Sequence, residues 1–169
     1  MNDSKSRLLE IVSLSAEYCE AVRSSVNFEK DEFINRILDL MPRIYWNFLV
    51  FSVEEGFEDP SFGYVQTYVD EEMYDAVRRD ISILLGEDDV FLETFEEDMK
   101  YSDTPIAATI SESLADIFQP LFNFISVVRE SDGEQSVEAY LECREHFESY
   151  WSQILCNVLR ALNNLKFNR

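Results

Sequence analysis

The chain has 169 residues, of which 46% are hydrophobic, 14% aromatic and 28% charged. This length and apolar content suit a single domain, residues 1–169, with a buried core, and exclude a disordered chain. The 34 acidic and 14 basic residues give a net charge of −20, which repels phosphate backbones and anionic lipids. We therefore expect neither a nucleic-acid nor a membrane partner.

Two helices are predicted in the first third of the chain. Apolar residues recur at helical spacing over residues 5–25, and again from residue 28 to about residue 50. Pro42 interrupts the second segment, yet the apolar face continues across it without a change of phase. We therefore predict one kinked helix here and not two separate helices.

Three further helices are predicted, separated by two acidic segments that contain aromatic residues. A helix over 70–85 has Asp70 to cap it and Gly86 to end it, and a helix from residue 110 to about residue 130 begins with Thr109 and Glu112 as a capping box. The longest helix covers about 136–165. The segments 54–69 and 87–105 lack helical periodicity and are interpreted as longer loops, with Phe57, Phe62, Tyr64 and Tyr68 pinning the first of them to the helices. The predicted fold is an all-α bundle of about five helices.

The cysteines and the apolar segments predict a cytoplasmic location. Cys19, Cys143 and Cys156 include no CxxC pair and are expected to be free thiols. The N-terminal residues lack the pattern of a signal peptide, and the longest apolar stretch, 44–53, is about half a membrane span.

Known catalytic and metal-binding patterns are weak or absent in this sequence. Cys143 and His146 share one helical face, but two further soft ligands for zinc are not evident. Acidic pairs at Glu17 and Glu20, Glu29 and Glu32, and Glu93 and Glu96 match half of the Mg²⁺ motif of all-α nucleotide pyrophosphatases. The single histidine and the four glycines exclude a hydrolase triad and a glycine-rich nucleotide loop. No catalytic residue, metal site or cofactor is predicted.

Two polar residues on apolar helical stripes need partners. Arg144 lies between Leu141 and Phe147 on the stripe of the last helix, and a buried guanidinium is costly unless it meets a carboxylate. Asp116, in an apolar part of the preceding helix, is the expected partner. The pair would be either a structural ion pair or the wall of a ligand pocket.

Three stretches resemble a bacterial family, domain of unknown function 5063. They are Met41 to Tyr45, Ser111 to Gln119, and Tyr150-Trp151 with the Asn-x-x-Arg-Ala-Leu segment at 157–162. Ser152 and Gln153 stand where the family pattern has a small glycine and more histidine character, which puts any site that depends on that histidine in doubt. The resemblance implies an all-helical cytoplasmic domain without an assigned reaction. It emphasises Arg43, Asp116, Trp151, Asn157 and Arg160.

Three functions remain open on this evidence. The leading hypothesis is a non-catalytic binding or interaction domain that takes a small polar ligand or a protein in a groove between the kinked helix and the last two helices. The residues predicted to line that groove are Arg43, Asp116, Arg144, Trp151 and Arg160. The alternatives are a Mg²⁺-dependent hydrolase with clustered carboxylates and an acidic adaptor for a basic protein. Residues 54–103 carry 17 acidic and 3 basic side chains, so most of the negative charge lies there.

Overall fold

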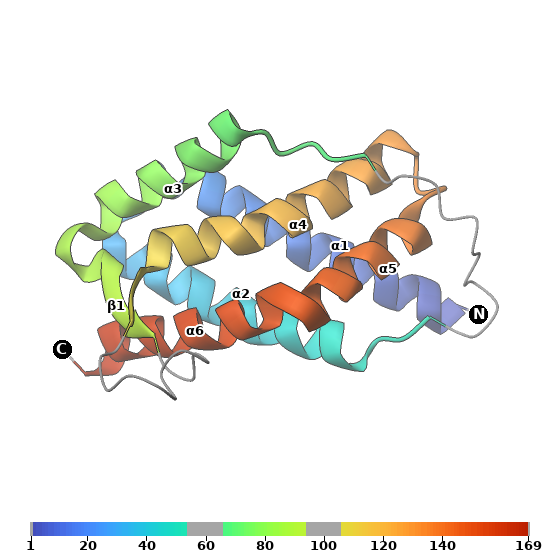
Figure 1. Ribbon diagram of the computed structural model, residues 1–169. Coiled ribbons are helices and arrows are strands. Elements are labelled where there is room, and N and C mark those ends of the chain that lie inside the picture. The colour runs from blue at the N-terminus through green and yellow to red at the C-terminus, as the bar shows by residue number, and fades with distance from the viewer. Residues whose placement is uncertain (1, 54–65, 94–105, 169) are drawn as a thin grey trace.

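The computed structural model describes residues 2–53, 66–93 and 106–168 as a mostly helical bundle (Figure 1). The long helices are α1 (Asn2–Arg23), α2 (Lys30–Val50), α3 (Glu71–Leu85), α4 (Ile110–Glu130), α5 (Ser136–His146) and α6 (Ser152–Phe167). The short elements are the 3₁₀ turns η1 (Ser25–Asn27) and η2 (Gly86–Asp89), the π turn η4 (Phe147–Trp151), and the strands β1 (Val90–Glu93) and β2 (Ile106–Thr109). Because η4 joins α5 to α6 without a break, the described residues form five long helical segments, as predicted.

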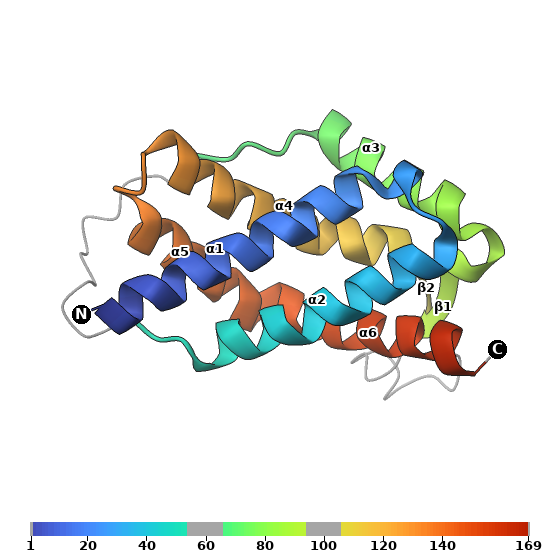
Figure 2. The same ribbon diagram turned by 180° about the vertical axis from the view of Figure 1, so that it is seen from behind.

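Helix α4 lies at the centre of the bundle and contacts α1, α3, α5 and α6. Both ribbon views show it between the other helices (Figures 1 and 2). Leu114, Ile117, Phe118 and Leu121 are each at most 1% exposed, so apolar side chains on more than one side of this helix are buried. A helix that buries most of its circumference is typical of the core of a bundle.

The second predicted helix is continuous through Pro42, as the unbroken apolar phase indicated. Proline cannot donate the usual backbone hydrogen bond, but Met41, Ile44 and Phe48 still face the core on both sides of it. Asn47 donates a side-chain hydrogen bond to the Arg43 carbonyl at 2.9 Å, one turn beyond the proline. Core packing therefore holds the two halves in one helix.

The predicted caps are confirmed at three helix ends. The Asp70 side chain accepts a hydrogen bond from the Met73 amide at 2.8 Å, and the Thr109 side chain accepts one from the Glu112 amide at 3.3 Å. Gly86 ends α3 with a φ of 58°, which other residues rarely adopt. Each cap satisfies a backbone group that the helix itself leaves without a partner.

The interpretation of 87–105 as irregular was wrong at its beginning. β1 pairs with β2 in an antiparallel hairpin-like sheet, with Val90 opposite Thr109 and Glu93 opposite Ile106. The strand was missed because it follows a run of acidic residues and has four residues, too few to show a clear alternation of apolar and polar side chains. Residues 94–105 lie outside the described residues.

The chain just before α3 was predicted to be held against the helices by aromatic side chains, and Tyr68 is the one of these within the described residues. Tyr68 packs against the hydrophobic core, and the Asn123 side chain accepts hydrogen bonds from the Tyr68 and Val69 amides at 2.6 and 3.0 Å. Phe57, Phe62 and Tyr64 lie outside the described residues. The side-chain carboxamide of Asn123 on α4 therefore fixes the path of the chain that leads into α3.

A buried carboxylate fixes the start of α4. Asp89 is 4% exposed and accepts hydrogen bonds from both the amide and the hydroxyl of Ser111, each at 2.7 Å. These groups lie in the first turn of α4, where backbone amides lack helical partners and the helix dipole favours a negative charge. The contact also ties η2 to the central helix.

We predict that Asp89→Ala lowers the free energy of unfolding by about 2–3 kcal/mol, because it leaves two buried donors without their charged acceptor. Urea denaturation followed by circular dichroism measures the change. Glu134→Ala, which removes an exposed carboxylate in the turn after α4, should cost less than about 0.5 kcal/mol. Equal losses in the two variants would contradict the assigned role of Asp89.

Candidate functional site

Two of the five residues predicted to line a common groove have structural roles elsewhere. Arg43 is exposed on α2 and forms a salt bridge with Asp39, one turn away, at 2.7 Å. Trp151 is fully buried, with edge-to-face contacts to Phe48 and Phe147 at ring-centroid distances of 5.0 and 4.7 Å. The indole of Trp151 is therefore part of the aromatic core between α2 and the last helices.

The predicted ion pair between Arg144 and Asp116 is wrong. The Arg144 guanidinium donates hydrogen bonds to the Phe51 carbonyl, at the C-terminal end of α2, and to the Glu148 carboxylate at 3.1 Å. The Tyr140 hydroxyl donates to the same Phe51 carbonyl at 2.8 Å, and burial raises the pKa of Tyr140 to about 12. Arg144 thus caps α2, where carbonyls lack helical partners and a cation is favoured.

Asp116 instead accepts hydrogen bonds from two tyrosines on other elements. The Tyr74 hydroxyl of α3 donates at 2.6 Å, and the Tyr150 hydroxyl of η4 also hydrogen-bonds to this carboxylate. Burial raises the pKa of Asp116; Glu112 raises it further, whereas the two hydroxyls oppose the shift. We name Tyr74, Asp116 and Tyr150 the tyrosine–aspartate cluster.

The tyrosine–aspartate cluster joins two of the stretches that carry the family resemblance. Asp116 comes from the stretch 111–119, and Tyr150 precedes the buried Trp151. Tyr74 was not found by sequence reasoning, because its apolar ring continues the α3 stripe and nothing near it indicates a partner on α4. The half-exposed Tyr150 lay within a matched stretch and could have been inferred from it.

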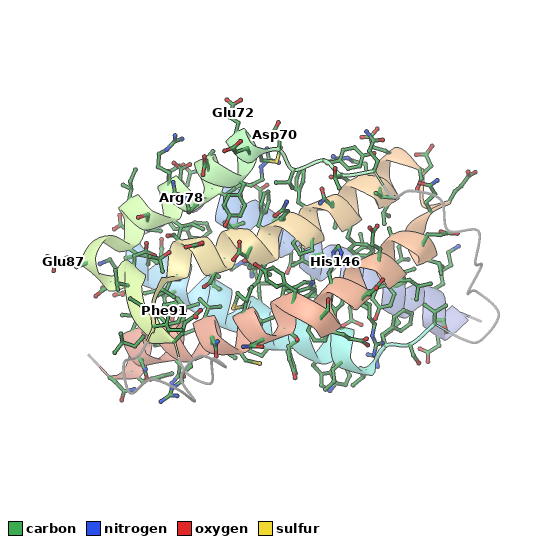
Figure 3. All side chains as sticks on the ribbon, in the orientation of Figure 1. Asp70, Glu72, Arg78, Glu87, Phe91 and His146 are labelled. Atoms are coloured by element: carbon green, nitrogen blue, oxygen red, sulfur yellow. The ribbon has the colours of Figure 1, made fainter. Side chains whose placement is uncertain are left out.

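Arg160 lies in a separate groove between α6 and β1. The hollow has a volume of about 350 Å³, and its described lining residues are Phe91, Leu92, Asn157, Arg160, Ala161 and Asn164. On α6 these residues follow helical spacing, so the guanidinium and the two carboxamides face one way. Figure 3 shows Phe91 where β1 meets α6. We name this hollow the α6 groove.

The five predicted residues do not line one groove. Arg144 and Arg160 are 16 positions apart on the continuous helical segment from α5 to α6, which corresponds to a separation of about 24 Å. Asp116 joins the tyrosine–aspartate cluster, Trp151 is in the core and Arg43 is on the outer side of α2. Of the five, Arg160 is the residue that lines the α6 groove.

The Cys143 and His146 side chains lie in different environments. Cys143 is buried, its thiol contacts the Pro120 carbonyl at 3.7 Å, and burial raises its pKa well above the usual value. A thiol must lose its proton to bind zinc, and here the protonated form is favoured. His146 is exposed.

Three of the carboxylates proposed for Mg²⁺ have other partners in the structure. Glu29 and Glu32 form a capping box at the start of α2, and Glu17 forms an ion pair with Arg36 at 3.7 Å. Across residues 2–53, 66–93 and 106–168, no three His, Cys, Asp or Glu side chains gather as ligands of one metal ion. Glu96 lies outside these ranges.

Comparisons with known proteins place this architecture in a family. The chain matches the family Domain of unknown function (DUF5063) over residues 2–168. It belongs to that family. The fold is also similar to the crystal structure of protein BF1032 from Bacteroides fragilis, with a TM-score of 0.80 and 27% sequence identity, over 96% of this chain and 94% of that one. None of the curated proteins matches significantly. No helix in the described part of this DUF5063 chain has the length and apolar character to span a bilayer.

We predict that Asp116→Asn changes how stability depends on pH. Because the folded pKa of Asp116 lies above its ordinary value of 3.8, the folded state favours the protonated acid. Its contribution to stability is present at low pH and decreases as pH rises above about 4. The free energy of unfolding of the wild type minus that of Asp116→Asn should therefore fall between about pH 4 and pH 7.

Urea denaturation at a series of pH values tests this dependence. Tyr74→Phe is the matched variant, because it keeps Asp116 and removes a hydrogen bond that favours the carboxylate. It should raise the pKa of Asp116 further and steepen the loss of stability with pH. Curves for the wild type and Asp116→Asn that run parallel across this range would contradict the assignment.

Proposed function

We propose that this DUF5063 domain is a non-catalytic, cytoplasmic binding domain whose ligand is a small organic anion held in the α6 groove. The observation that carries the proposal is the lining of this groove. Arg160, Asn157 and Asn164 supply hydrogen-bond donors along one side, and Phe91 and Leu92 supply an apolar wall. Small-molecule sites commonly combine such apolar walls with a few convergent polar groups, in volumes of about 300–1,000 Å³.

The chemistry of the lining side chains supports an anion. Among the described residues that line the α6 groove, Arg160 is the ionisable one. Guanidinium binds carboxylate and phosphate in a planar, two-point geometry, and the neighbouring carboxamides can donate to the same oxygens. A flat apolar body on the ligand would then lie against Phe91. The expected ligand is a small aromatic or branched carboxylate.

The same lining argues against catalysis in this groove. Its described residues provide amide, guanidinium and hydrocarbon groups, and these do not act as a nucleophile or as a general base near neutral pH. The runner-up function, a Mg²⁺-dependent hydrolase, would need clustered carboxylates. Three of its candidate carboxylates, Glu17, Glu29 and Glu32, pair with Arg36 or cap α2.

The acidic adaptor remains a second candidate because of the outer side of α3 and η2. Glu72 and Glu87 project away from the bundle there (Figure 3), and Asp70 is exposed at the start of α3. A basic protein partner would meet these side chains first. Such binding would weaken steeply with salt, whereas the anion proposed for the α6 groove would be held by short-range hydrogen bonds as well.

We predict that benzoate binds the protein and that Arg160→Gln weakens this binding by about 10-fold or more, because hydrogen bonds to a charged group contribute about 1.5–3 kcal/mol. Isothermal titration calorimetry measures the affinity, and line broadening of ligand protons detects weak binding. Benzamide has the same shape without the charge and should bind at least about 10-fold more weakly than benzoate.

Arg129→Gln is the matched control, since Arg129 is an exposed arginine at the far end of α4. It should leave benzoate binding unchanged. Equal binding of benzoate and benzamide, or equal affinities of the wild type and Arg160→Gln, would refute the proposed site. A rise in melting temperature on addition of millimolar Mg²⁺ would instead support the hydrolase.

A further inference from the structure

A second surface, at the opposite end of the bundle from the α6 groove, carries exposed apolar side chains. Trp46, Leu49 and Val50 lie on the outer side of the last turns of α2 and are 50%, 53% and 43% exposed; Leu9 of α1 is 59% exposed. Spacings of three and four place the three α2 residues next to one another. The Arg7 guanidinium stacks over the Trp46 ring at 4.8 Å, which brings the first turns of α1 alongside them.

These side chains adjoin a concave, apolar groove of about 530 Å³. The groove is formed by the N-terminal half of α1, the chain just after α2, and the α4–α5 turn. Its apolar lining includes Leu8, Leu9, Val12, Phe51, Val128 and Val137. Leu9 belongs to both surfaces, and Phe51 directly follows the exposed Val50. Figure 2 shows α1 and α2 side by side on this face. We name the groove together with Trp46, Leu49 and Val50 the α1–α2 face.

The charge of the α1–α2 face differs from that of the rest of the chain. Residues 4–9 and 40–53 contain Lys5, Arg7 and Arg43 and no acidic residue, although the whole chain carries 34. Arg43 pairs with Asp39, whereas Lys5 lines the groove and Arg7 stacks on Trp46 beside it. The one acid among the described lining residues is Asp132, in the α4–α5 turn across the groove from α2.

We propose that the α1–α2 face binds an amphipathic helix of a partner protein, with apolar residues in the groove and acidic residues beside Lys5 and Arg7. Helix-in-groove recognition uses apolar anchors at i, i+3 or i+4, and i+7. Exposed tryptophan and arginine are the residue types that most often dominate binding energy at such interfaces. Asp132 sets the direction: the end of the partner helix that lies near it carries no acid.

The shape and the charge favour this occupant over two others. A bilayer requires a convex apolar surface that can enter it, whereas this groove is hollow, and a net charge of −20 repels anionic lipids. In a two-fold dimer the face would meet a copy of itself, whose described groove lining offers Lys5 and Arg7 one acid, Asp132. An amphipathic acidic helix can fill the groove with its apolar residues and pair its acidic residues with Lys5 and Arg7.

The test uses two synthetic peptides of about 16 residues, roughly 24 Å as a helix. Both carry leucine at helical spacing; the residues flanking these leucines are glutamate in one peptide and lysine in the other. Fluorescence anisotropy of labelled peptide measures binding to the whole chain. The acidic peptide should bind, and the basic peptide should bind at least about 10-fold more weakly.

Leu49→Glu places a negative charge on the α1–α2 face, which repels the acidic peptide. This variant should therefore weaken binding of that peptide by about 10-fold or more. Because Leu49 is more than half exposed, this variant should fold. Ile83→Glu is the matched control: Ile83 is 73% exposed on α3, away from this face, and its substitution should leave binding within about 2-fold. Arg160→Gln should also bind the peptide normally, so this test is independent of the α6 groove.

Three results would overturn the proposal. The first is no difference between the acidic and basic peptides, or no binding of either. The second is a concentration-dependent dimer in sedimentation that Leu49→Glu abolishes, because the occupant would then be a second copy. The third is co-sedimentation with vesicles of phosphatidylserine and phosphatidylcholine that Leu49→Glu abolishes, because the occupant would then be a membrane.

Discussion

The arrangement of this bundle depends on how the central helix α4 begins. α4 packs against α1, α3, α5 and α6, so a displacement of this helix would change nearly every helix–helix interface in the core. Asp89 fixes that position through the amide and hydroxyl of Ser111, with its own charge buried against the positive end of the helix dipole. The same carboxylate joins η2 to α4, and β2 ends at Thr109, the N-cap of α4. The β1–β2 pair and the start of α4 therefore form one structural unit. Phe91 and Leu92 of β1, which belong to this unit, form one wall of the α6 groove.

Features decided within one helical turn were predictable from the sequence. The caps at Asp70 and Thr109 depend on side chains that contact amides three residues away, and the continuity of α2 through Pro42 followed from the phase of its apolar face. The number and order of the helices follow from the same local signals. Such features need no knowledge of which segments meet in space.

Features that depend on contacts between distant segments were not predictable. Arg144 was expected to need a carboxylate, yet its partner across the core is the Phe51 carbonyl, and any helix end exposes such acceptors. Asp116 meets tyrosines 42 and 34 positions away, with no shared motif to indicate the contact. Arg160 was expected in a groove between α2 and the last two helices, but the groove that it lines has β1 as its other wall, and the short β1 was not predicted from the sequence.

The π turn at Phe147–Trp151 acts as a length adjustment between two helices that face different neighbours. A π turn holds one residue more than an α-helical turn, and Phe147, Trp151 and Leu155 consequently point into the core at a constant spacing of four. Removing one residue between Glu148 and Tyr150 would let this turn return to ordinary α-helical winding, and α6 would keep its orientation relative to α5. If all the residues present wound as an α-helix instead, α6 would be rotated by about 100° and Arg160 would turn away from β1 although no residue near it had changed. A relative with a gap of one residue at this turn and α-helical winding there would therefore keep the orientation of α6 and of its groove.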